Sequence, residues 1–365
     1  MTFVSEITAH LNLEIPTQYQ ESYDNCGLLV GSPNIQIKQI LVTLDVTEEV
    51  VNEAIATNCN LIIAHHPIIF KGIKSLTGKN YFERAIIKAI KNDIAIIAVH
   101  TNLDNIAGGV NFKIAEKLGL QNIKILAPKS DLLRKLTVFV PTDKVSSLTE
   151  ALHIAGASNI GNYRDCSFIS EGVGSFRPNE NANPTIGQKN KLEQVAEARI
   201  EVIFTIDIEK AVIAAMKKAH PYEEVAYYIS KLENENQHVG AGAIGDLPQE
   251  MRTEYFLDKM KAIFRAKTIR HTKQLKDTAK KIAVCGGAGS FLLQNAISQN
   301  ADIFVSSDFK YHEFFDAEDK IMIADIGHYE SEQYTKDLIQ EIILKKFPNI
   351  AVLLSKINTN PVFYT

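Results

Sequence analysis

Two adjacent histidines end the apolar run NLIIAHHPIIF at residues 60–70. Successive side chains of a regular strand point to opposite faces, so His65 and His66 would diverge if both belonged to one strand. Pro67 holds the residue before it in extended backbone and stops further strand pairing, which favours a strand that has just ended. Adjacent imidazoles at such a position can serve two different partners. The alternative for this pair alone is two polar residues at the start of a loop.

A second pair of residues suited to metal binding occurs in GHYESE, where a helix is expected to begin after Gly327. His328 and Glu332 are four residues apart, so on a helix they share one face and can act as a two-ligand arm. The alternative is an ordinary polar pair on a solvated helix face. With the histidine pair and Asp104, the chain offers five ligand-type residues, which suit two cations about 3.5–4 Å apart that share one carboxylate.

The elements expected to position these residues alternate between two periods from residue 38 onward. Strands that are apolar throughout, separated by helices of about ten or more residues, are typical of α/β layers. Functional groups in such sheets gather at the carboxyl ends of the strands, where the histidine pair and the segment HTNLD both lie. We therefore expect them to meet. The expected strands span 38–46, 61–70 and 94–104, and the expected helices span 47–58, 81–93 and 110–120.

The character of the sequence changes near residue 131. The pattern to residue 236 reads strand, helix, two strands, helix and strand, with residues 163–178 alternating like a hairpin. This β-α-β-β-α-β order is that of the ferredoxin-like split unit. Because α/β alternation resumes afterwards, we predict an inserted domain. The predicted division is 1–130 for the first half of the core, 131–236 for the insertion and 237–365 for the second half.

Composition restricts the class of protein. Of 365 residues 45% are hydrophobic and 22% charged, the net charge is −4, and Lys and Arg are scattered, which argues against a nucleic-acid or membrane-surface partner. The four cysteines are widely spaced and predict reduced thiols rather than a disulfide framework. The start of the chain predicts an amphipathic helix stopped by Pro16, without the features of a signal peptide or a membrane span. We expect a cytoplasmic protein.

Five motifs together resemble one family. ESYDNCGLLVG, IAHHPIIF, AVHTNLD, SSDFKYHEF and GHYESE occur in the order seen in the NIF-three-like family, also called GTP cyclohydrolase type 2 homologues. The resemblance covers essentially the whole chain, including an insertion similar to the PII-like insertion of the longer bacterial members. It implies a two-half α/β NIF-three-like core with an inserted ferredoxin-like (PII-like) α+β domain. It also implies a ring-shaped homohexamer with two divalent metal ions in each chain.

The resemblance implies a role for each of the five ligand-type residues. His66 and Asp104 would bind one ion, His65 and His328 the other, and Glu332 would bridge the two. A set of histidines and carboxylates favours zinc, with iron or manganese as alternatives, over magnesium or calcium, which prefer oxygen ligands alone. The two histidines of the opening motif would then diverge because each serves a different ion.

Two positions depart from the family pattern. Tyr23 stands where the family usually has tryptophan, and Ser306-Ser307 stands where it usually has Thr-Gly. Neither change removes an expected ligand, but both are expected to reshape the mouth of the pocket. Asp24 and Asn25 suit a turn as well as a pocket wall. The segment CGGAGS after a strand resembles a phosphate cradle, although without a P-loop lysine close backbone packing is the better interpretation.

Further candidates flank the expected metal site. His100 precedes TNLD and is our candidate catalytic residue, as a proton carrier or hydrogen-bond donor, with a structural histidine at a strand end as the alternative. Asp308, Lys310 and His312 alternate in SDFKYHEF, so on one strand they would share a face. We expect these three to contact the metal ligands or the substrate.

The leading functional hypothesis is a metal-dependent hydrolase. A hydroxide bridging two ions would attack a small nucleotide-like or phosphate-containing substrate, and the family name suggests ring opening of GTP. The alternative is a metal-binding regulatory or scaffold protein with a ligand-sensing PII-like domain. We expect a homohexamer of trimer–dimer symmetry whose clefts open toward an internal cavity, which would limit substrates to small molecules or flexible chains.

Overall fold

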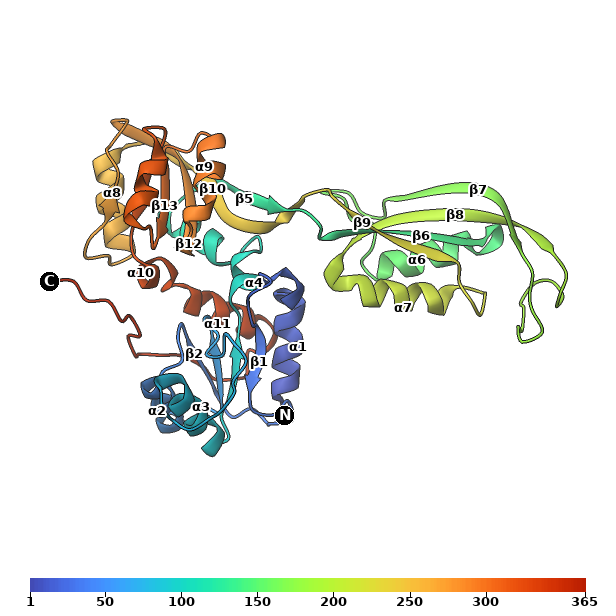
Figure 1. The fold of residues 1–365 in the computed structure, drawn as a ribbon, viewed down its shortest axis with the longest axis horizontal. Coiled ribbons are helices and arrows are strands. Elements are labelled where there is room, and N and C mark those ends of the chain that lie inside the picture. Colours follow the sequence, from blue (N-terminus) through green and yellow to red (C-terminus); the bar gives the residue numbers. More distant parts are fainter. The chain divides into compact units, whose positions relative to one another are not determined.

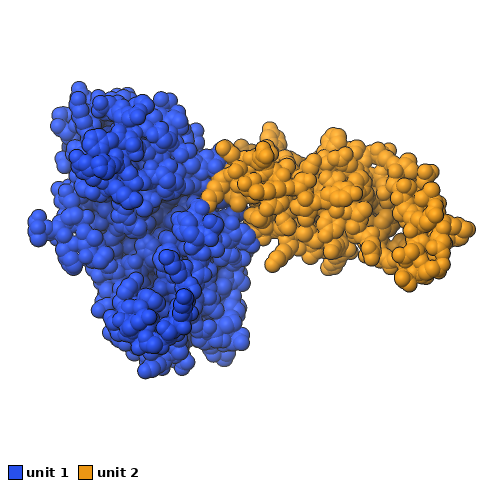
Figure 2. All heavy atoms as spheres, viewed as in Figure 1, with its two compact units in different colours: residues 1–128, 237–365 blue, residues 129–236 orange.

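Helices cover three separate sheets in the computed structural model, which describes residues 1–365 (Figure 1). The chain divides into two compact units, shown in different colours in Figure 2. Unit 1 contains Met1–Pro128 and Gln237–Thr365, and unit 2 contains Lys129–Asn236. The mixed α/β class that the sequence pattern predicts is confirmed. No helix combines the length and the apolar character that crossing a membrane would require.

The first sheet of unit 1 has five strands in the order β1-β4-β3-β2-β15. All neighbours in it are parallel except β1, which runs antiparallel to β4. Its last strand comes from the C-terminal end of the chain, so residues 1–130 do not build this sheet alone. The strands are β1 (Gly27–Val30), β2 (Ile40–Thr43), β3 (Leu61–Ala64), β4 (Ala95–Ala98) and β15 (Val352–Leu354).

Helices of unit 1 begin and end at the expected kinds of residue. The Thr47 hydroxyl accepts a hydrogen bond from the Val50 N–H at the start of α2, as the sequence predicts, and Asn80 caps α3 in the same way. Gly119, with φ of 77°, ends α5. The helices packed on and beside this sheet are α1 (Val4–Glu14), α2 (Glu48–Ala56), α3 (Tyr81–Lys91), α4 (Thr101–Asp104), α5 (Val110–Leu118) and α11 (Thr335–Lys346).

The second sheet of unit 1 has six strands in the order β11-β14-β13-β12-β10-β5. The three central strands β14, β13 and β12 are parallel, whereas β11 runs antiparallel to β14 and β10 runs antiparallel to β12. Since β5 comes from the first half of the chain, the two halves exchange strands. The elements are β5 (Gln121–Lys129), β10 (Asn236–Arg252), α8 (Thr253–Ile263), β11 (Arg270–His271), β12 (Thr278–Ala288), α9 (Leu293–Ser298), β13 (Ile303–Ser307), β14 (Met322–Asp325) and α10 (His328–Glu332).

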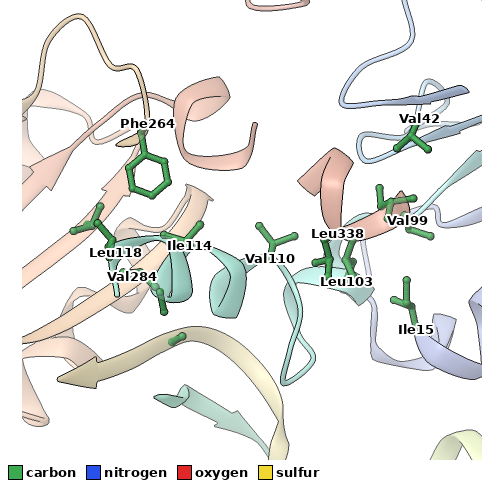
Figure 3. Packing of buried hydrophobic residues seen from close by; sticks show 14 of the residues in the cluster. Ile15, Val42, Val99, Leu103, Val110, Ile114, Leu118, Phe264, Val284 and Leu338 are labelled. Atoms are coloured by element: carbon green, nitrogen blue, oxygen red, sulfur yellow. The ribbon is translucent and has the colours of Figure 1, made fainter. Parts of the chain in front are cut away.

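One hydrophobic core joins both halves of unit 1. Its middle is α5, whose buried Val110, Ile114 and Leu118 lie along one row (Figure 3). Toward one end of that row lie Phe264 and Val284, and toward the other lie Leu103 and Leu338 (Figure 3). Because the halves share a core, residues far apart in sequence are held rigidly against one another.

Unit 2 has a separate core. Its elements follow the predicted β-α-β-β-α-β order, and its antiparallel sheet has the order β7-β8-β6-β9. Helices α6 and α7 pack together on one face of this sheet (Figure 1). The hairpin expected within 163–178 is instead a single strand that pairs with β8 across a long connection. The elements are β6 (Leu133–Pro141), α6 (Val145–Ile154), β7 (Ser167–Phe176), β8 (Glu193–Thr205), α7 (Glu209–Ala219) and β9 (Tyr227–Leu232).

The strands expected over 38–46 and 61–70 end early, at Thr43 and Ala64, and two further strands are wrong at their carboxyl ends. The strand expected over 94–104 ends at Ala98, and Asp104 belongs to the helical turn α4, where its N–H donates to the His100 carbonyl. The strand expected to carry residues 308–312 ends at Ser307. Asp308 adopts a φ of 58°, and a 3-10 helix follows over Tyr311–Ala317. Both errors arise because apolar alternation does not reveal where a local turn ends the strand.

Candidate metal centre

His65 lies directly after β3 and is fully buried. Its Nδ1–H donates to the Val99 carbonyl at 2.9 Å, which leaves Nε2 as the free ring nitrogen. Nε2 lies 3.6 Å from Asp104 Oδ1 and 3.8 Å from Glu332 Oε1. Burial lowers the pKa of His65 to about 4. The imidazole is therefore neutral near pH 7, and its Nε2 can act as a ligand.

The ring of His66 lies beside that of His65, with centroids 4.8 Å apart, rather than on the opposite side of the strand end. Its Nδ1 lies 2.8 Å from Asp45 Oδ1, and the other oxygen of Asp45 accepts a hydrogen bond from Thr359 Oγ1 at 2.6 Å. Nε2 of His66 lies 3.1 Å from Glu332 Oε2. Burial opposes protonation, but the carboxylates of Asp45 and Glu332 raise the pKa of His66 to about 10.

His328 and Glu332 share one face of α10, as the spacing predicts. Nε2 of His328 lies 3.2 Å from Glu332 Oε2 and 3.4 Å from His66 Nε2. Its Nδ1 lies 2.6 Å from Asp308 Oδ2. Burial opposes the charge on this ring, yet the carboxylates of Asp308 and Glu332 raise the pKa of His328 to about 11.

The three imidazoles follow one rule: Nδ1 is held by an oxygen acceptor and Nε2 faces Glu332. An acceptor on one ring nitrogen fixes the orientation of the ring and leaves the other nitrogen for a metal. Buried polar atoms without partners are rare and call for an ion or a water. Here His65 Nε2, Asp104 Oδ1 and Glu332 Oε2 are all buried without a hydrogen bond. We call the five residues His65, His66, Asp104, His328 and Glu332 the metal-ligand cluster, and their arrangement fits divalent cations.

The pKa values of the two carboxylates of the cluster are shifted in opposite directions. Burial, followed by the neighbouring charge of Glu332, raises the pKa of Asp104 well above its usual range. Burial acts in the same direction on Glu332, but the three neighbouring histidines lower the pKa of Glu332 well below its usual range. Glu332 thus remains ionised at the centre of the cluster, where positive charge is favoured.

The distances group the ligands differently from the expected assignment. Two ligand atoms that are each about 2.1 Å from one tetrahedral ion lie about 3.4 Å apart. The pairs at about this separation are His66 with His328, at 3.4 Å, and His65 with Asp104, at 3.6 Å. The reason is local: Val99 holds His65 facing α4, and Asp45 holds His66 facing α10.

His100 borders the cluster. Its ring centroid lies 5.3 Å from those of both His65 and His66, and the three can place ligand-type atoms within 4.8 Å of one another. Nδ1 of His100 lies 2.9 Å from Asp24 Oδ1, and Asp24 also accepts hydrogen bonds from the N–H and hydroxyl of Thr101. Despite burial, these hydrogen bonds lower the pKa of Asp24. A carboxylate therefore orients His100 toward the cluster.

A cleft of about 1530 Å³ gives access to the cluster. Its walls include the loop 67–75, Gly286 and Gly287 near the end of β12, and the C-terminal segment 359–364. Lys71 and Lys74 on the loop are exposed and make no ion pair. The cleft can therefore admit a small molecule, and it offers cationic side chains to an anionic one.

Comparison with known proteins identifies the family. The family model described as Duf34/NIF3 (NGG1p interacting factor 3) matches residues 2–361. The chain belongs to the NIF3 family. It is 42% identical over 343 residues to the GTP cyclohydrolase 1 type 2 homolog of Halalkalibacterium halodurans, covering 93% of this chain and 92% of that one. The Bacillus subtilis protein of the same name is 41% identical over 352 residues, covering 95% and 94%.

A solved structure shows the same architecture. The Bacillus cereus protein related to NIF3 superposes with a TM-score of 0.85 at 39% identity, covering 100% of this chain and 99% of that one. The NIF3-like fold expected from the motifs is therefore confirmed.

The candidate residues expected to flank the metal site of this NIF3 family member do not all lie near it. Asp308 lines the cleft and contacts His328. Lys310 and His312 are exposed and lie outside the cleft lining, because the 3-10 helix turns them away; His312 instead contacts the ring of Tyr311. The expectation that all three residues face the site is wrong for these two. Tyr23 lines the cleft and is exposed.

The glycines of CGGAGS make room for the cluster. A Cβ on Gly287, which has a φ of 61°, would lie 2.4 Å from Glu332 Oε1. The Ser306 and Ser307 hydroxyls donate to the Gly287 carbonyl at 3.1 and 2.6 Å. These serines therefore hold the backbone at Gly287 in place and do not shape the mouth of the cleft. The interpretation as close backbone packing is confirmed.

Sequence reasoning missed two residues that orient ligands. Asp45 was treated only as part of a strand, although its place at the carboxyl end of β2, beside β3, is a signal that could have found it. Thr359 lies in an irregular C-terminal segment, and no pattern there indicates its contact with Asp45.

Proposed function

We propose that this chain binds two divalent cations in the metal-ligand cluster and uses them to hydrolyse a small nucleotide-like or phosphate-containing substrate. The observation that carries the proposal is the convergence on Glu332 of three histidine Nε2 atoms, each with its Nδ1 held by an acceptor. Zinc suits this ligand set, with iron or manganese as alternatives.

The grouping of distances supports one assignment of the ligands. His65 and Asp104 would share an ion with Glu332 Oε1, and His66 and His328 would share an ion with Glu332 Oε2. Bound there, such cations supply Lewis acidity and lower the pKa of a water molecule toward neutrality. The rest of the work falls to side chains of the chain itself.

His100 is the candidate proton carrier. Its Nδ1 is fixed by Asp24 and its ring faces the cluster, so its remaining nitrogen can take or give a proton at a substrate in the cleft. Lys71 and Lys74 would attract the anionic part of that substrate. The names of the relatives make ring opening of GTP one reaction to test.

Elemental analysis tests the metal proposal. We expect two transition ions per chain in the wild type and loss of most of both in Glu332→Ala, because each oxygen of Glu332 serves one ion. Glu330→Gln is the matched control: it lies on the same helix, and its amide oxygen can still accept the hydrogen bond from Asn360. A single ion that survives Glu332→Ala would contradict the assignment.

Turnover of a nucleotide and phosphoester panel with added zinc or manganese tests the hydrolase. For any substrate that is turned over, kcat should fall about 10²–10⁴-fold in His100→Gln, because this change removes the proton carrier. The metal content of this variant should stay unchanged. An equal loss of metal in this variant would place His100 among the ligands instead. No turnover by a fully metal-loaded wild type would favour the alternative.

The alternative is a metal-binding regulatory protein in which unit 2 is a ligand-sensing, PII-like module. What favours it is that unit 2 has its own core and its own cavity of about 960 Å³. Metal would then stabilise the protein without turnover.

A further inference from the structure

The cavity of unit 2 lies on the open face of its sheet. Leu136, Val138 and Ile200 point to the face covered by α6 and α7. Since side chains alternate along a strand, Phe139 and Arg199 point to the other face, where they are direct partners across β6 and β8. The cavity is enclosed there by residues 172–186 and 222–226.

Glu197 is a buried carboxylate in this cavity. It is 8% exposed, and no lysine, arginine or histidine forms an ion pair with it. A Cβ on Gly174 would lie 1.9 Å from Glu197 Oε2, so the glycine leaves room for the carboxylate in this position. A buried carboxylate without a cation or sufficient donors is costly. Glu197 therefore presents to the cavity a carboxylate that no cationic side chain of the protein neutralises.

Tyr222 places a second polar atom beside Glu197. Its hydroxyl is buried and has no hydrogen bond of good geometry, and burial together with the Glu197 carboxylate raises the pKa of Tyr222. The ring is held on both sides, with centroids 5.2 Å from His220 and 5.9 Å from Phe176. His220 is itself fixed, because Nε2 donates to the Phe139 carbonyl at 2.8 Å and Nδ1 accepts from the Tyr222 N–H at 3.1 Å.

The opposite wall is tied in place. The Asn183 N–H donates to Glu223 Oε1 at 2.8 Å, and the Thr185 hydroxyl donates to the Pro221 carbonyl at 2.9 Å. Arg177 also lines the cavity, is exposed, and makes no ion pair or hydrogen bond. The cavity thus combines a buried acceptor, aromatic side chains and an available cation at its edge.

We propose that this cavity binds a small molecule that has a flat head with paired N–H donors and an anionic tail. The head, an amidine-like group as in guanine or a guanidinium ion, would donate to Glu197 and lie against Phe139, Phe176 or Tyr222. The tail, a carboxylate or phosphate, would bind Arg177. The residues of this site all belong to unit 2, whereas the metal-ligand cluster belongs to unit 1. If the protein is regulatory, as in the alternative function, this is the class of ligand that unit 2 would sense.

Calorimetric titration of the full-length protein tests the proposal with two matched pairs of probes. GMP is compared with IMP, which lacks the 2-amino donor, and L-arginine with L-citrulline, which lacks the positive charge. At least one of GMP and L-arginine should bind on the order of tenfold more tightly than its partner. Absence of a difference within both pairs would overturn the proposal.

Variants then locate the binding. Glu197→Gln should weaken the preferred probe on the order of tenfold or more while the protein stays folded, and Arg177→Ala should weaken it severalfold. Unchanged affinity in both variants would overturn the proposal. Loss of self-association in Glu197→Gln without any change in affinity would also overturn it, because Glu197 would then bind a side chain of a second copy rather than a small molecule. Metal content and panel turnover should not change in Glu197→Gln, so failure here is distinguishable from failure of the hydrolase proposal.

Discussion

At the scale of single residues, the arrangement of the metal-ligand cluster depends on groups that are not themselves proposed ligands. Val99, Asp45 and Asp308 each hold one Nδ1, by a carbonyl in the first case and a carboxylate in the other two. A carboxylate partner makes the imidazole a stronger ligand, whereas a carbonyl mainly orients it. The metal affinity of His66 and His328 should therefore depend more on their Nδ1 partners than that of His65 does.

Asp45→Ala tests this dependence. Loss of the acceptor at His66 Nδ1 frees the ring, and we expect one of the two ions to bind about 10- to 100-fold more weakly. Competition with a chromophoric chelator measures both affinities. Asp45→Asn is the matched control, because its amide oxygen can still accept from Nδ1 and should preserve most of the affinity. Equal weakening of both ions would contradict the assignment of His66 and His328 to a single ion.

Gly287→Ala tests whether the glycine loop makes room for Glu332. The new Cβ would lie 2.4 Å from Glu332 Oε1, so we expect loss of metal as well as of stability. Gly161→Ala controls for backbone strain alone, since its φ is 55°, close to the 61° of Gly287, and no atom lies within 4 Å of the added Cβ. The control should cost about 1–2 kcal/mol and keep its metal. Full metal content in Gly287→Ala would show that Glu332 can move aside.

At the scale of elements, the loop before α3 is held by one carboxylate. Glu83 Oε2 accepts hydrogen bonds from the N–H groups of Thr77, Gly78 and Lys79, at 2.9 to 3.2 Å. These hydrogen bonds, that from the Thr77 N–H most of all, lower the pKa of Glu83 to about 2, although burial acts in the opposite direction. This loop continues from the cleft wall that carries Lys71 and Lys74, so its order affects substrate access.

The lowered pKa gives a pH dependence with a definite sign. A carboxyl whose pKa is lower in the folded state stabilises the fold above its unfolded value of 4.5 and stops doing so as the pH falls toward 2. We expect the difference in Tm between wild type and Glu83→Gln to be full above pH 5 and to shrink below about pH 4.5. Calorimetric melting of both proteins from pH 3 to 7 measures it. A difference independent of pH would show that Glu83 acts only through packing.

The elements show how far sequence reasoning reaches. Apolar runs with turn signals predicted β2, β3 and the helices around them, because each has a strong local period. The same reasoning extended β4 through Asp104 and made a strand of residues 308–312, since a helical turn or a positive φ leaves no mark on alternation. The metal-ligand cluster was anticipated because strand ends converge, but its grouping depends on ring orientations that only the fold determines.

At the scale of the whole molecule, exposed apolar side chains occur on both units. Phe291, Tyr311 and Phe315 are more than 60% exposed on unit 1, as are Phe168 and Tyr228 on unit 2. Large exposed apolar side chains are typical of surfaces that meet other chains. We propose that these side chains belong to the two kinds of interface that a hexamer of trimer–dimer symmetry requires. We therefore expect light scattering to give about six times the chain mass of 40.6 kDa, and a monomer at micromolar concentration would contradict this.

Removal of residues 131–236 tests which unit carries which interface. The remaining chain keeps its core intact, because unit 2 has a separate hydrophobic core, and a short linker can close the gap since Gly240 of β10 packs against Ala127 and Pro128 of β5. We expect the shortened protein to fold and to retain both ions, because every residue of the metal-ligand cluster lies in unit 1. Its mass in solution should fall to that of a dimer or trimer, since only one kind of interface remains. An intact hexamer without unit 2 would show that unit 1 alone forms both interfaces and would leave the inserted unit free to respond to its own ligand.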